Sequence, residues 1–192
     1  MLYRVIKAAF DSAFIAEIET IVADLPQEKG ATVENDDYST RQCDLRWITY
    51  GTPGFALAQD RIFAVLRDER IDAPGEWALE NLQYTAYGPN GFHNWHIDAY
   101  RRSYNKYDLS LDPRFIGKKR ALSVSILLNG GDAFTGGAFE VSLFPNGRNT
   151  VGSAIEGFSD AGDMAVFDSG LCHRVAPVAS GLRKSLVAWI CA

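Results

Sequence analysis

The sequence predicts a mainly β protein of the α+β class, in which a sandwich or barrel of short strands has two helices packed outside it. Two amphipathic helical stretches occupy the first third of the chain, and short strand-like runs separated by glycine, asparagine or proline fill the rest. The 192 residues, 47% of them hydrophobic, are enough for one sizeable core and few for two domains. We therefore expect a single domain over residues 1–192.

The first predicted helix lies within residues 11–26. Its apolar residues recur at helical spacing, with Asp11 or Ser12 as the N-cap and Pro26 as the stop signal. The residues of its apolar face are Phe14, Ile18, Ile21, Val22 and Leu25. An amphipathic face of this kind requires a core to pack against.

The second predicted helix lies within residues 52–70. Thr52 is a favourable N-cap, and Pro53 suits the first helical position, where no backbone N–H is needed. The residues of its apolar face are Phe55, Ile62, Phe63 and Leu66. Both helices are expected to cover the outside of the sheet.

Five runs rich in valine, leucine, isoleucine and aromatic residues predict strands. They are residues 81–87, 120–129, 136–144, 163–169 and 183–192. No long helix interrupts them. Several short strands at regular intervals are typical of a sandwich or barrel.

Charge and composition exclude several classes of protein. The formal charge of −5 and the pI of about 5.2 argue against a protein whose main partner is nucleic acid or an anionic membrane. The chain has no apolar run of membrane-spanning length and no secretory signal, which predicts a cytoplasmic protein. The cysteines are odd in number and scattered, so they predict buried side chains rather than disulfides or a cysteine zinc site. They are Cys43, Cys172 and Cys191.

The short stretch "NWHID", residues 94–98, carries the first chemical signal. The chain has only three histidines, and here His96 precedes Asp98 by two positions. On a strand these two side chains project from one face, about 7 Å apart, while Ile97 points the other way. A His-x-Asp pair is common by chance, so a third ligand is needed to make a site.

The two other histidines differ in their surroundings. His93 follows a turn-like "PNGF" and lies three residues before His96, so we expect it to face away from His96, in a loop or in solvent. His173 follows an apolar strand, which can place it beside the His-x-Asp pair. Two imidazoles and one carboxylate from neighbouring strands form the facial triad that binds non-heme Fe(II) and leaves coordination positions open.

Several motifs in order resemble the Fe(II)/2-oxoglutarate-dependent dioxygenase superfamily, and within it the prolyl 4-hydroxylase type. The segment "YGPNGFHNWHIDAY" looks like the family's turn into His-x-Asp, and "RALSVSILLNGGDAFTGGAFEV" is similar to its paired central strands. "AGDMAVFDSGLCHRVAPVASGLRKSLVAWI" resembles the closing strands, and "YSTRQCDLRWI" the lead-in segment. The resemblance covers roughly residues 38–190 and implies a double-stranded β-helix, the jelly-roll barrel.

The resemblance also implies roles for individual residues. His96, Asp98 and His173 match the iron ligands. Arg183, ten residues after His173, matches the basic residue that pairs with the distal carboxylate of 2-oxoglutarate, as a planar guanidinium can. Ser185, two positions further along the strand, could donate another hydrogen bond to that carboxylate, or be an ordinary strand hydroxyl.

Two further positions, Tyr87 and Leu127, bear on how the pocket holds the distal carboxylate. Tyr87 matches a tyrosine found in the family's pocket, although a core aromatic explains it equally well. Leu127 stands where many prolyl hydroxylases carry a tyrosine that helps to hold the distal carboxylate. The pocket is therefore expected to rely on Arg183, Ser185 and Tyr87. Asp98 keeps its carboxylate, which separates this chain from the halogenating branch and predicts hydroxylation.

The reaction that the resemblance implies is hydroxylation of an unactivated C–H bond, with Fe(II) as cofactor, ascorbate as an optional addition, and dioxygen and 2-oxoglutarate as cosubstrates. The expected substrate is a prolyl residue in a peptide or protein, or alternatively a free amino acid or other small molecule. Two other classes stay open: a zinc-dependent hydrolase with the same three ligands, and a non-catalytic jelly-roll binding module. Arg183 favours the oxygenase, since a hydrolase needs no dedicated carboxylate clamp.

A basic segment, residues 101–120, follows the His-x-Asp pair. It holds seven basic residues against two acidic ones in an acidic protein. Two interpretations stand: a lid over the iron that meets the substrate, or a solvated loop that balances an acidic face. Trp189, on the predicted face of Ser185, is expected to line the pocket or to belong to the core.

Overall fold

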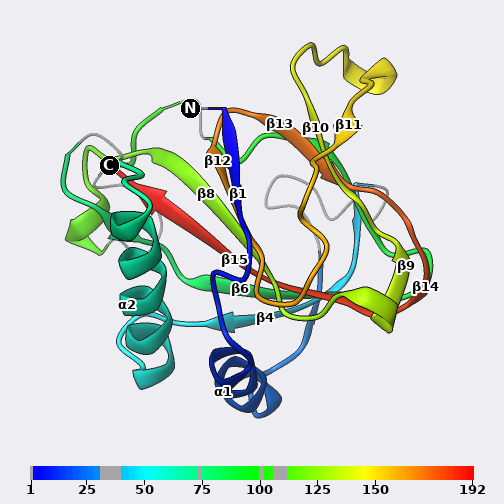
Figure 1. Ribbon diagram of the computed structural model, residues 1–192. Helices are drawn as coiled ribbons and strands as arrows, with labels where there is room; N and C mark the ends of the chain where they lie inside the picture. Colours follow the sequence, from blue (N-terminus) through cyan, green and yellow to red (C-terminus); the bar gives the residue numbers. More distant parts are fainter. Residues whose placement is uncertain (1, 31–39, 73–74, 100–101, 106–111) are drawn as a thin grey trace.

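The computed structural model describes residues 2–30, 40–72, 75–99, 102–105 and 112–192. Two antiparallel sheets face each other (Figure 1). The large sheet has the order β1 (Tyr3–Ile6), β12 (Met164–Asp168), β8 (Arg120–Leu127), β15 (Arg183–Cys191), β6 (Leu82–Tyr87), β4 (Asp44–Ile48) and β2 (Glu28–Lys29), with β5 (Ala78–Leu79) also paired to β15. The small sheet has the order β11 (Ser153–Ala154), β10 (Phe139–Ser142), β13 (Cys172–Val175), β7 (Phe92–His96) and β3 (Arg41–Gln42).

A further pair, β9 (Phe134–Gly136) and β14 (Val178–Gly181), closes one end of the barrel. Single 3-10 turns span Pro113–Phe115, Gly131–Ala133 and Gly147–Asn149. The fold is the predicted jelly roll, mostly β with two helices. Within the described ranges, no helix is both long enough and apolar enough to cross a membrane.

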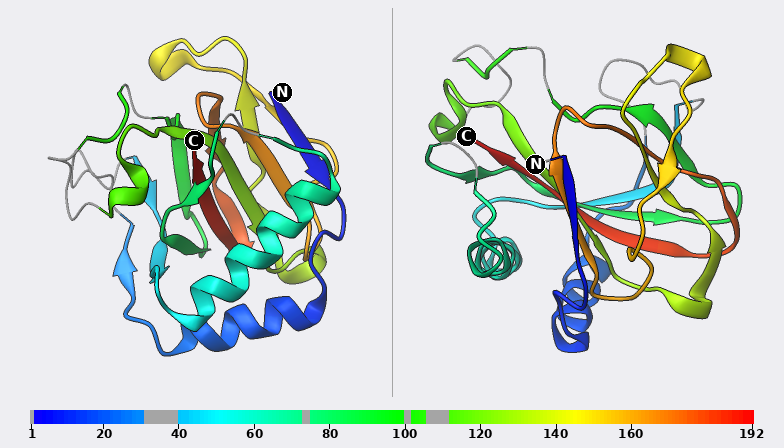
Figure 2. Two further views of the ribbon diagram at one scale, coloured as in Figure 1. Left: turned by 90° about the vertical axis from the view of Figure 1, so that its left-hand side faces the viewer. Right: turned by 45° about the horizontal axis from the view of Figure 1, so that its top comes forward.

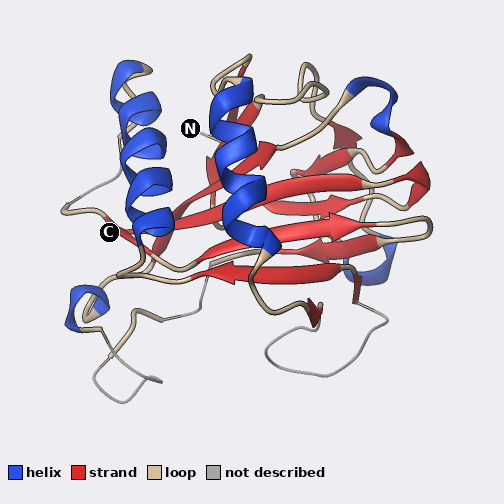
Figure 3. Ribbon diagram, turned by 90° about the horizontal axis from the view of Figure 1, so that it is seen from below, coloured by secondary structure: helices blue, strands red, loops and turns tan. Residues whose placement is uncertain are grey.

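The two predicted helices form where the sequence places their caps. Helix α1 spans Ser12–Ala23, and the Asp11 side chain accepts a hydrogen bond of 2.8 Å from the N–H of Phe14. Helix α2 spans Pro53–Asp68, and the Thr52 hydroxyl accepts from the N–H of Phe55 at 3.2 Å. These caps satisfy N–H groups that have no partner inside the helix. The helices lie side by side across the outer face of the large sheet (Figure 3).

The large sheet separates two apolar clusters. Along β8, Leu122, Val124 and Ile126 pack toward the helices, and the alternate residues Ser123 and Ser125 face the inside of the barrel. A smaller apolar cluster has members on both sheets. Figure 2 shows the backbone of these sheets from two further sides. All three cysteines are free and buried, as predicted. Because polar residues line the inner face of a buried strand, the barrel interior is where a binding site is expected.

The first third of the chain is less helical than its sequence suggests. Strand β1 pairs with β12 at one edge of the large sheet, and β4 pairs with β6 near the other edge. Strand β4 buries residues on both of its faces: Leu45 belongs to the cluster inside the barrel and Ile48 to the cluster under the helices. Its apolar residues therefore do not follow a simple alternation with the charged ones. Such a short strand between two helical patterns gives little periodic signal.

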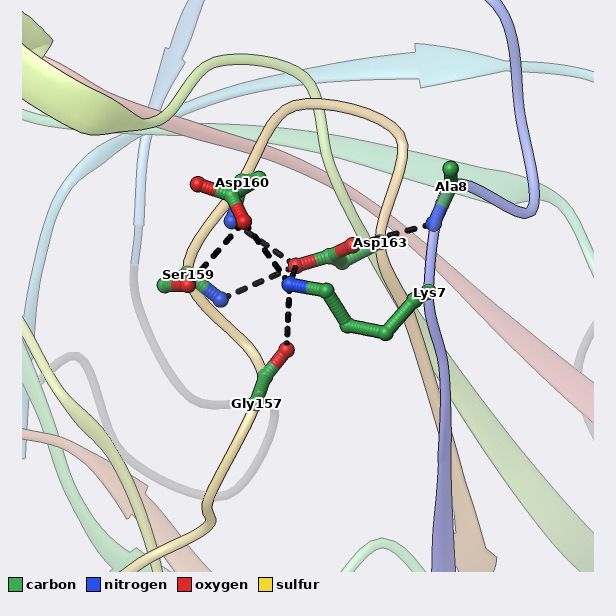
Figure 4. A network of polar contacts seen from close by, with 6 residues as sticks. All are labelled: Lys7, Ala8, Gly157, Ser159, Asp160 and Asp163. Carbon is green, nitrogen blue, oxygen red and sulfur yellow. Dashed lines mark hydrogen bonds and ion pairs between the residues drawn. The ribbon is translucent and has the colours of Figure 1, made fainter.

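A buried carboxylate fastens the N-terminal strand to the loop before β12 (Figure 4). Asp163, whose side chain is 1% exposed, accepts a hydrogen bond of 2.6 Å from the Lys7 ammonium. It also accepts from the backbone N–H groups of Ala8, Ser159 and Asp160, at 3.1, 3.1 and 2.8 Å. Both carboxylate oxygens are therefore satisfied, which is what a buried charge requires.

We expect Asp163→Asn to lower the free energy of unfolding by about 2–3 kcal/mol, because the amide loses the charge-assisted bonds and turns an N–H₂ group toward backbone donors. Burial alone would raise the pKa of Asp163, but the bonds from Lys7 and the backbone outweigh it and lower the pKa below 3.8. This contribution is therefore present above about pH 4 and lost as the pH falls through the folded-state pKa. Urea unfolding at pH 7 and pH 3 measures both effects.

The neighbouring Asp160 provides the control, because its side chain is 64% exposed. Asp160→Asn should change stability little. Equal losses for the two variants would contradict the role assigned to Asp163.

Candidate active site

Three predicted residues converge at one end of the barrel. His96 ends β7 and lies directly opposite His173 on the neighbouring strand β13. Asp98 follows β7, with its carboxylate oxygens 3.8 Å from Nε2 of His96 and 3.6 Å from Nε2 of His173. One ligand atom from each residue lies within 4.8 Å of the others. These distances are too long for hydrogen bonds but suit neighbouring ligands of one ion, whose metal–ligand bonds are about 2.0–2.2 Å.

Backbone carbonyls orient both imidazoles. Nδ1 of His96 lies 2.7 Å from the carbonyl oxygen of Asn94, and Nδ1 of His173 lies 2.9 Å from that of Leu171. In each ring Nδ1–H is thus the donor, and the lone pair of Nε2 points toward Asp98. This arrangement is typical of metal-binding histidines, whose second nitrogen donates to a carbonyl or carboxylate.

The charge states also suit a divalent cation. Burial lowers the pKa of His96 to about 3, and the adjacent His173 adds to this effect, so the His96 ring is neutral. Burial opposes ionisation of Asp98, but His173, His96 and Arg120 outweigh it and lower the pKa of its carboxyl. The cluster thus offers two nitrogen donors and one carboxylate, the set that non-heme iron favours.

The prediction for His93 is wrong. His93 lies within β7 and its ring stacks on that of His96, with the ring centroids 3.6 Å apart. His173 pairs with His96 but Val175 pairs with His93, so β7 has one more residue than β13 over this stretch. This bulge offsets the alternation of side chains and turns two residues three positions apart to the same side. Burial lowers the pKa of His93 well below 6.5, which leaves it neutral.

Arg183 is buried inside the barrel, and the described part of the chain places no acidic side chain against it. Its side chain is 1% exposed, and its Nη1 donates to the Ser185 hydroxyl at 3.2 Å. That hydroxyl in turn lies 2.7 Å from the hydroxyl of Thr85. Burial lowers the pKa of Arg183 to about 10, so it remains a cation at neutral pH. Among the described residues no carboxylate pairs with this cation, which makes its surroundings a site for an anionic ligand.

A cavity of about 210 Å³ opens beside Arg183. Its larger lining residues are Leu127, Phe134, Phe139, Phe158 and Arg183. Leu127 thus lies in the pocket. The resemblance places Leu127 at the position where many prolyl hydroxylases carry a tyrosine. Phe139 also stacks on the ring of His173 at 5.3 Å, so one aromatic side chain connects the cavity to the histidine cluster.

Tyr87 interacts with two buried arginines. Its ring centre is 5.7 Å from the Arg183 guanidinium, and burial raises the pKa of its phenol. The second is Arg41, which is 6% exposed and donates to Gln83 at 2.5 Å and to the Cys43 sulfur at 3.0 Å. Sequence analysis missed Arg41; the only signal was its place in the lead-in segment "YSTRQCDLRWI", of which Tyr38 and Ser39 lie outside the described residues.

Part of the basic segment is also described. Arg101 and residues 106–111 lie outside the described ranges. Arg114 pairs with Asp112 at 2.6 Å and lies over the Tyr50 ring, and Arg120 pairs with Glu80. These cations are therefore engaged within the chain. Trp189 is 6% exposed and lies under the Arg120 guanidinium, in the barrel wall.

The jelly-roll barrel holds two histidines and a carboxylate at one end, and inside it a buried cation that no described carboxylate pairs with. This arrangement suits the class of non-heme metal enzymes that bind an acidic cosubstrate. The family model of the 2OG-Fe(II) oxygenase superfamily matches residues 82–191, more than half of the chain and the whole of this cluster. The chain belongs to the 2OG-Fe(II) oxygenase superfamily, and its cofactors are Fe(II) and 2-oxoglutarate. This match selects the oxygenase over the zinc hydrolase and the binding module.

Solved structures share the fold at low sequence identity. A viral collagen prolyl hydroxylase from Paramecium Bursaria Chlorella virus-1, in complex with 2-oxoglutarate, aligns with a TM-score of 0.64 and 16% identity over 100% of this chain and 97% of its own. A prolyl-4-hydroxylase from Pseudomonas putida gives 0.62 and 21% over 98% and 91%. The α-ketoglutarate-dependent epimerase SnoN from nogalamycin biosynthesis gives 0.67 and 15% over 98% and 76%. No curated protein matches the chain by sequence.

Proposed function

We propose that this oxygenase hydroxylates a prolyl residue in a peptide or protein, with Fe(II) bound by His96, Asp98 and His173 and 2-oxoglutarate bound by Arg183. The observation that carries the cosubstrate assignment is the buried Arg183 guanidinium without a carboxylate partner among the described residues. Prolyl hydroxylases among the similar structures support the substrate. Neighbours with other substrates define the alternative, a free amino acid or other small molecule.

The three metal-binding side chains have fixed roles in this proposal. His96 and His173 present Nε2 because their Nδ1–H groups are held by backbone carbonyls. Asp98 contributes one negative charge, which partly neutralises a divalent cation. Bound Fe(II) with 2-oxoglutarate supplies the activation of dioxygen, with oxidative decarboxylation of the cosubstrate to succinate and carbon dioxide.

Arg183 holds the distal carboxylate through its planar fork of N–H donors. The Ser185 hydroxyl lies beside Arg183 and 2.7 Å from that of Thr85; where Thr85 is the donor of this pair, the hydrogen of Ser185 is available to the carboxylate. Leu127, Phe134 and Phe158 line the cavity beside Arg183 and lower the local polarity, which strengthens these charged contacts. Phe139 and Phe167 lie against the His173 ring at 5.3 and 4.7 Å and extend the aromatic lining to the histidine cluster.

The surface around the cluster supports an extended substrate. Ile97, between two of the proposed ligands, is 51% exposed. Ser142 pairs with Cys172, so the hairpin that follows β10 leaves the barrel at the end that holds His173 (Figure 1). Leu143 and Phe144 on this hairpin are 56% and 87% exposed. Exposed apolar side chains beside a site are typical contact points for a peptide.

The test is a set of peptides in which a single proline is present or replaced by alanine, incubated with Fe(II), 2-oxoglutarate and ascorbate. We expect mass spectrometry to show the gain of one oxygen atom on proline, with succinate formed in equal amount. Free L-proline and other amino acids, assayed in parallel, test the alternative. Succinate coupled to oxidation of a free amino acid, with every peptide unmodified, would contradict the peptidyl assignment.

A further inference from the structure

Arg120 joins the metal-binding segment to a buried carboxylate. Its Nε and Nη2 donate to the two oxygens of Glu80 at 2.8 and 2.6 Å, and its Nη1 donates to the backbone carbonyl of Asp98 at 3.2 Å. The side chains of Arg120 and Glu80 are 13% and 15% exposed. Tyr104 donates its hydroxyl to the same Glu80 at 2.7 Å. Glu80, Arg120 and Tyr104 therefore meet at the Glu80 carboxylate, and Arg120 connects this group to Asp98.

A β-bulge turns Arg120 toward this position. Ile190 pairs with Leu122, but Cys191 pairs with Arg120, so Ala121 is an extra residue in β8. In a regular strand Arg120 would share the face of Leu122 and point toward the helices. The bulge directs it instead to the inner side of the sheet, where its guanidinium lies 4.1 Å from the centre of the Trp189 ring.

Besides Arg120, the sheet holds Asp98 through a side-chain hydrogen bond from Ser123 of β8 to its carboxyl and through backbone contacts. Asp98 lies beyond the last residue of β7, and the backbone N–H groups of Asp98 and Ala99 both donate to the carbonyl of Ser169, at 2.9 and 2.8 Å. The carbonyl of Asp98 accepts from Arg120. Glu80 is itself anchored, because its N–H donates to the carbonyl of Trp189 at 3.0 Å. The ion pair thus ties the carboxylate-bearing segment to the central strands.

We propose that Glu80 and Arg120 are positioning residues for the metal-binding carboxylate of Asp98, and that Tyr104 completes the arrangement. This inference rests on the proposed assignment of Asp98 as a ligand. The planar guanidinium matters, because it donates to Glu80 through two nitrogens and to Asp98 through the third. A lysine keeps the charge but cannot make all three contacts in that geometry.

The chain offers a matched control. Glu19 accepts from Lys184 at 3.1 Å and from the Tyr84 hydroxyl at 3.4 Å, with side chains of Glu19 and Lys184 that are 32% and 28% exposed. This glutamate, cation and tyrosine repeat the chemistry of the Glu80 group on the helix side of the sheet. Substitutions there reproduce the loss of a partly buried ion pair and make no contact with Asp98.

The experiment compares Arg120→Lys, Glu80→Gln and Tyr104→Phe with Glu19→Gln and Tyr84→Phe, using Co(II) as the probe in the absence of oxygen. Cobalt titration gives the dissociation constant, the visible spectrum reports ligand geometry, and thermal unfolding without metal reports the fold. For Arg120→Lys and Glu80→Gln we expect a dissociation constant about 10–100-fold higher and an altered spectrum, the usual effect of removing the support of a ligand. Tyr104→Phe should give a smaller change of the same kind, and both controls none.

Wild-type cobalt affinity and spectrum in Arg120→Lys and Glu80→Gln, whatever their unfolding temperature, would overturn the proposal. If either variant does not fold, Tyr104→Phe decides, since it keeps both charges: an unchanged spectrum and affinity would count against the positioning role. Asp98→Asn in the same titration tests separately whether Asp98 is a metal ligand at all. Unchanged cobalt binding in that variant would mean that Asp98 is not a ligand.

Discussion

Replacing Arg183 with methionine is expected to weaken 2-oxoglutarate binding severely, leave metal binding intact and raise the thermal stability of the ligand-free protein. Truncating one partner of a buried, hydrogen-bonded charge pair costs about 2–5 kcal/mol, so the dissociation constant for 2-oxoglutarate should rise from about 30-fold to several thousandfold. The gain in stability follows because methionine removes a buried charge that has no acidic partner among the described residues. Even the replacement of buried ion pairs by apolar residues of similar volume is often neutral or stabilising by about 1–4 kcal/mol.

Calorimetric titration of 2-oxoglutarate and thermal unfolding check the two parts of this prediction. Lys184→Met is the control, because Lys184 is the next residue in β15 and its side chain pairs with Glu19 on the other face of the sheet. Loss of metal binding together with 2-oxoglutarate binding in Arg183→Met would show that Arg183 supports the metal site. Unchanged 2-oxoglutarate affinity would remove Arg183 from the cosubstrate site.

Asp98→Asn is expected to reduce Fe(II) affinity by more than the 10–100-fold that loss of a supporting residue typically causes, and to bring turnover below detection. The amide has nearly the same shape, so the backbone contacts of Asp98 with Ser169 and Arg120 persist and the fold is retained. What is lost is the only carboxylate of the cluster and its charge. Anaerobic metal titration and the rate of succinate formation measure the two effects.

Asp132→Asn is the control for the loss of one negative charge, because Asp132 is exposed in the turn that follows β8. It should bind iron and turn over like the wild type. Full Fe(II) affinity in Asp98→Asn would contradict the ligand set and leave the two histidines without their third partner.

Local patterns were enough to predict much of the fold and the metal cluster. The helices begin directly after their N-caps, Asp11 and Thr52, because a side-chain cap is a short-range signal. His96 ends β7 and Asp98 lies two positions further on, just beyond the strand, and pairing of β7 with β13 brings His173 opposite His96. Each of these features depends on few residues or on one strand pairing.

Features that depend on irregular pairing could not be predicted from sequence. The bulges in β7 and β8 reverse the expected directions of His93 and Arg120, because one extra residue offsets strict alternation. The roles of Arg41 and Glu80 are visible only in their contacts with residues far along the chain. Their surroundings are tertiary, so neither composition nor spacing revealed them.

The most direct test of the central claim requires no knowledge of the substrate. The purified protein is loaded with Fe(II) without oxygen, 2-oxoglutarate is titrated in, and the visible metal-to-ligand charge-transfer band of the chelate is recorded. We predict a saturable band in the wild type that is absent in His96→Ala and reached only at much higher 2-oxoglutarate concentration in Arg183→Met. Bound iron without such a band in the wild type would contradict the assignment of this cluster as the site where Fe(II) and 2-oxoglutarate meet.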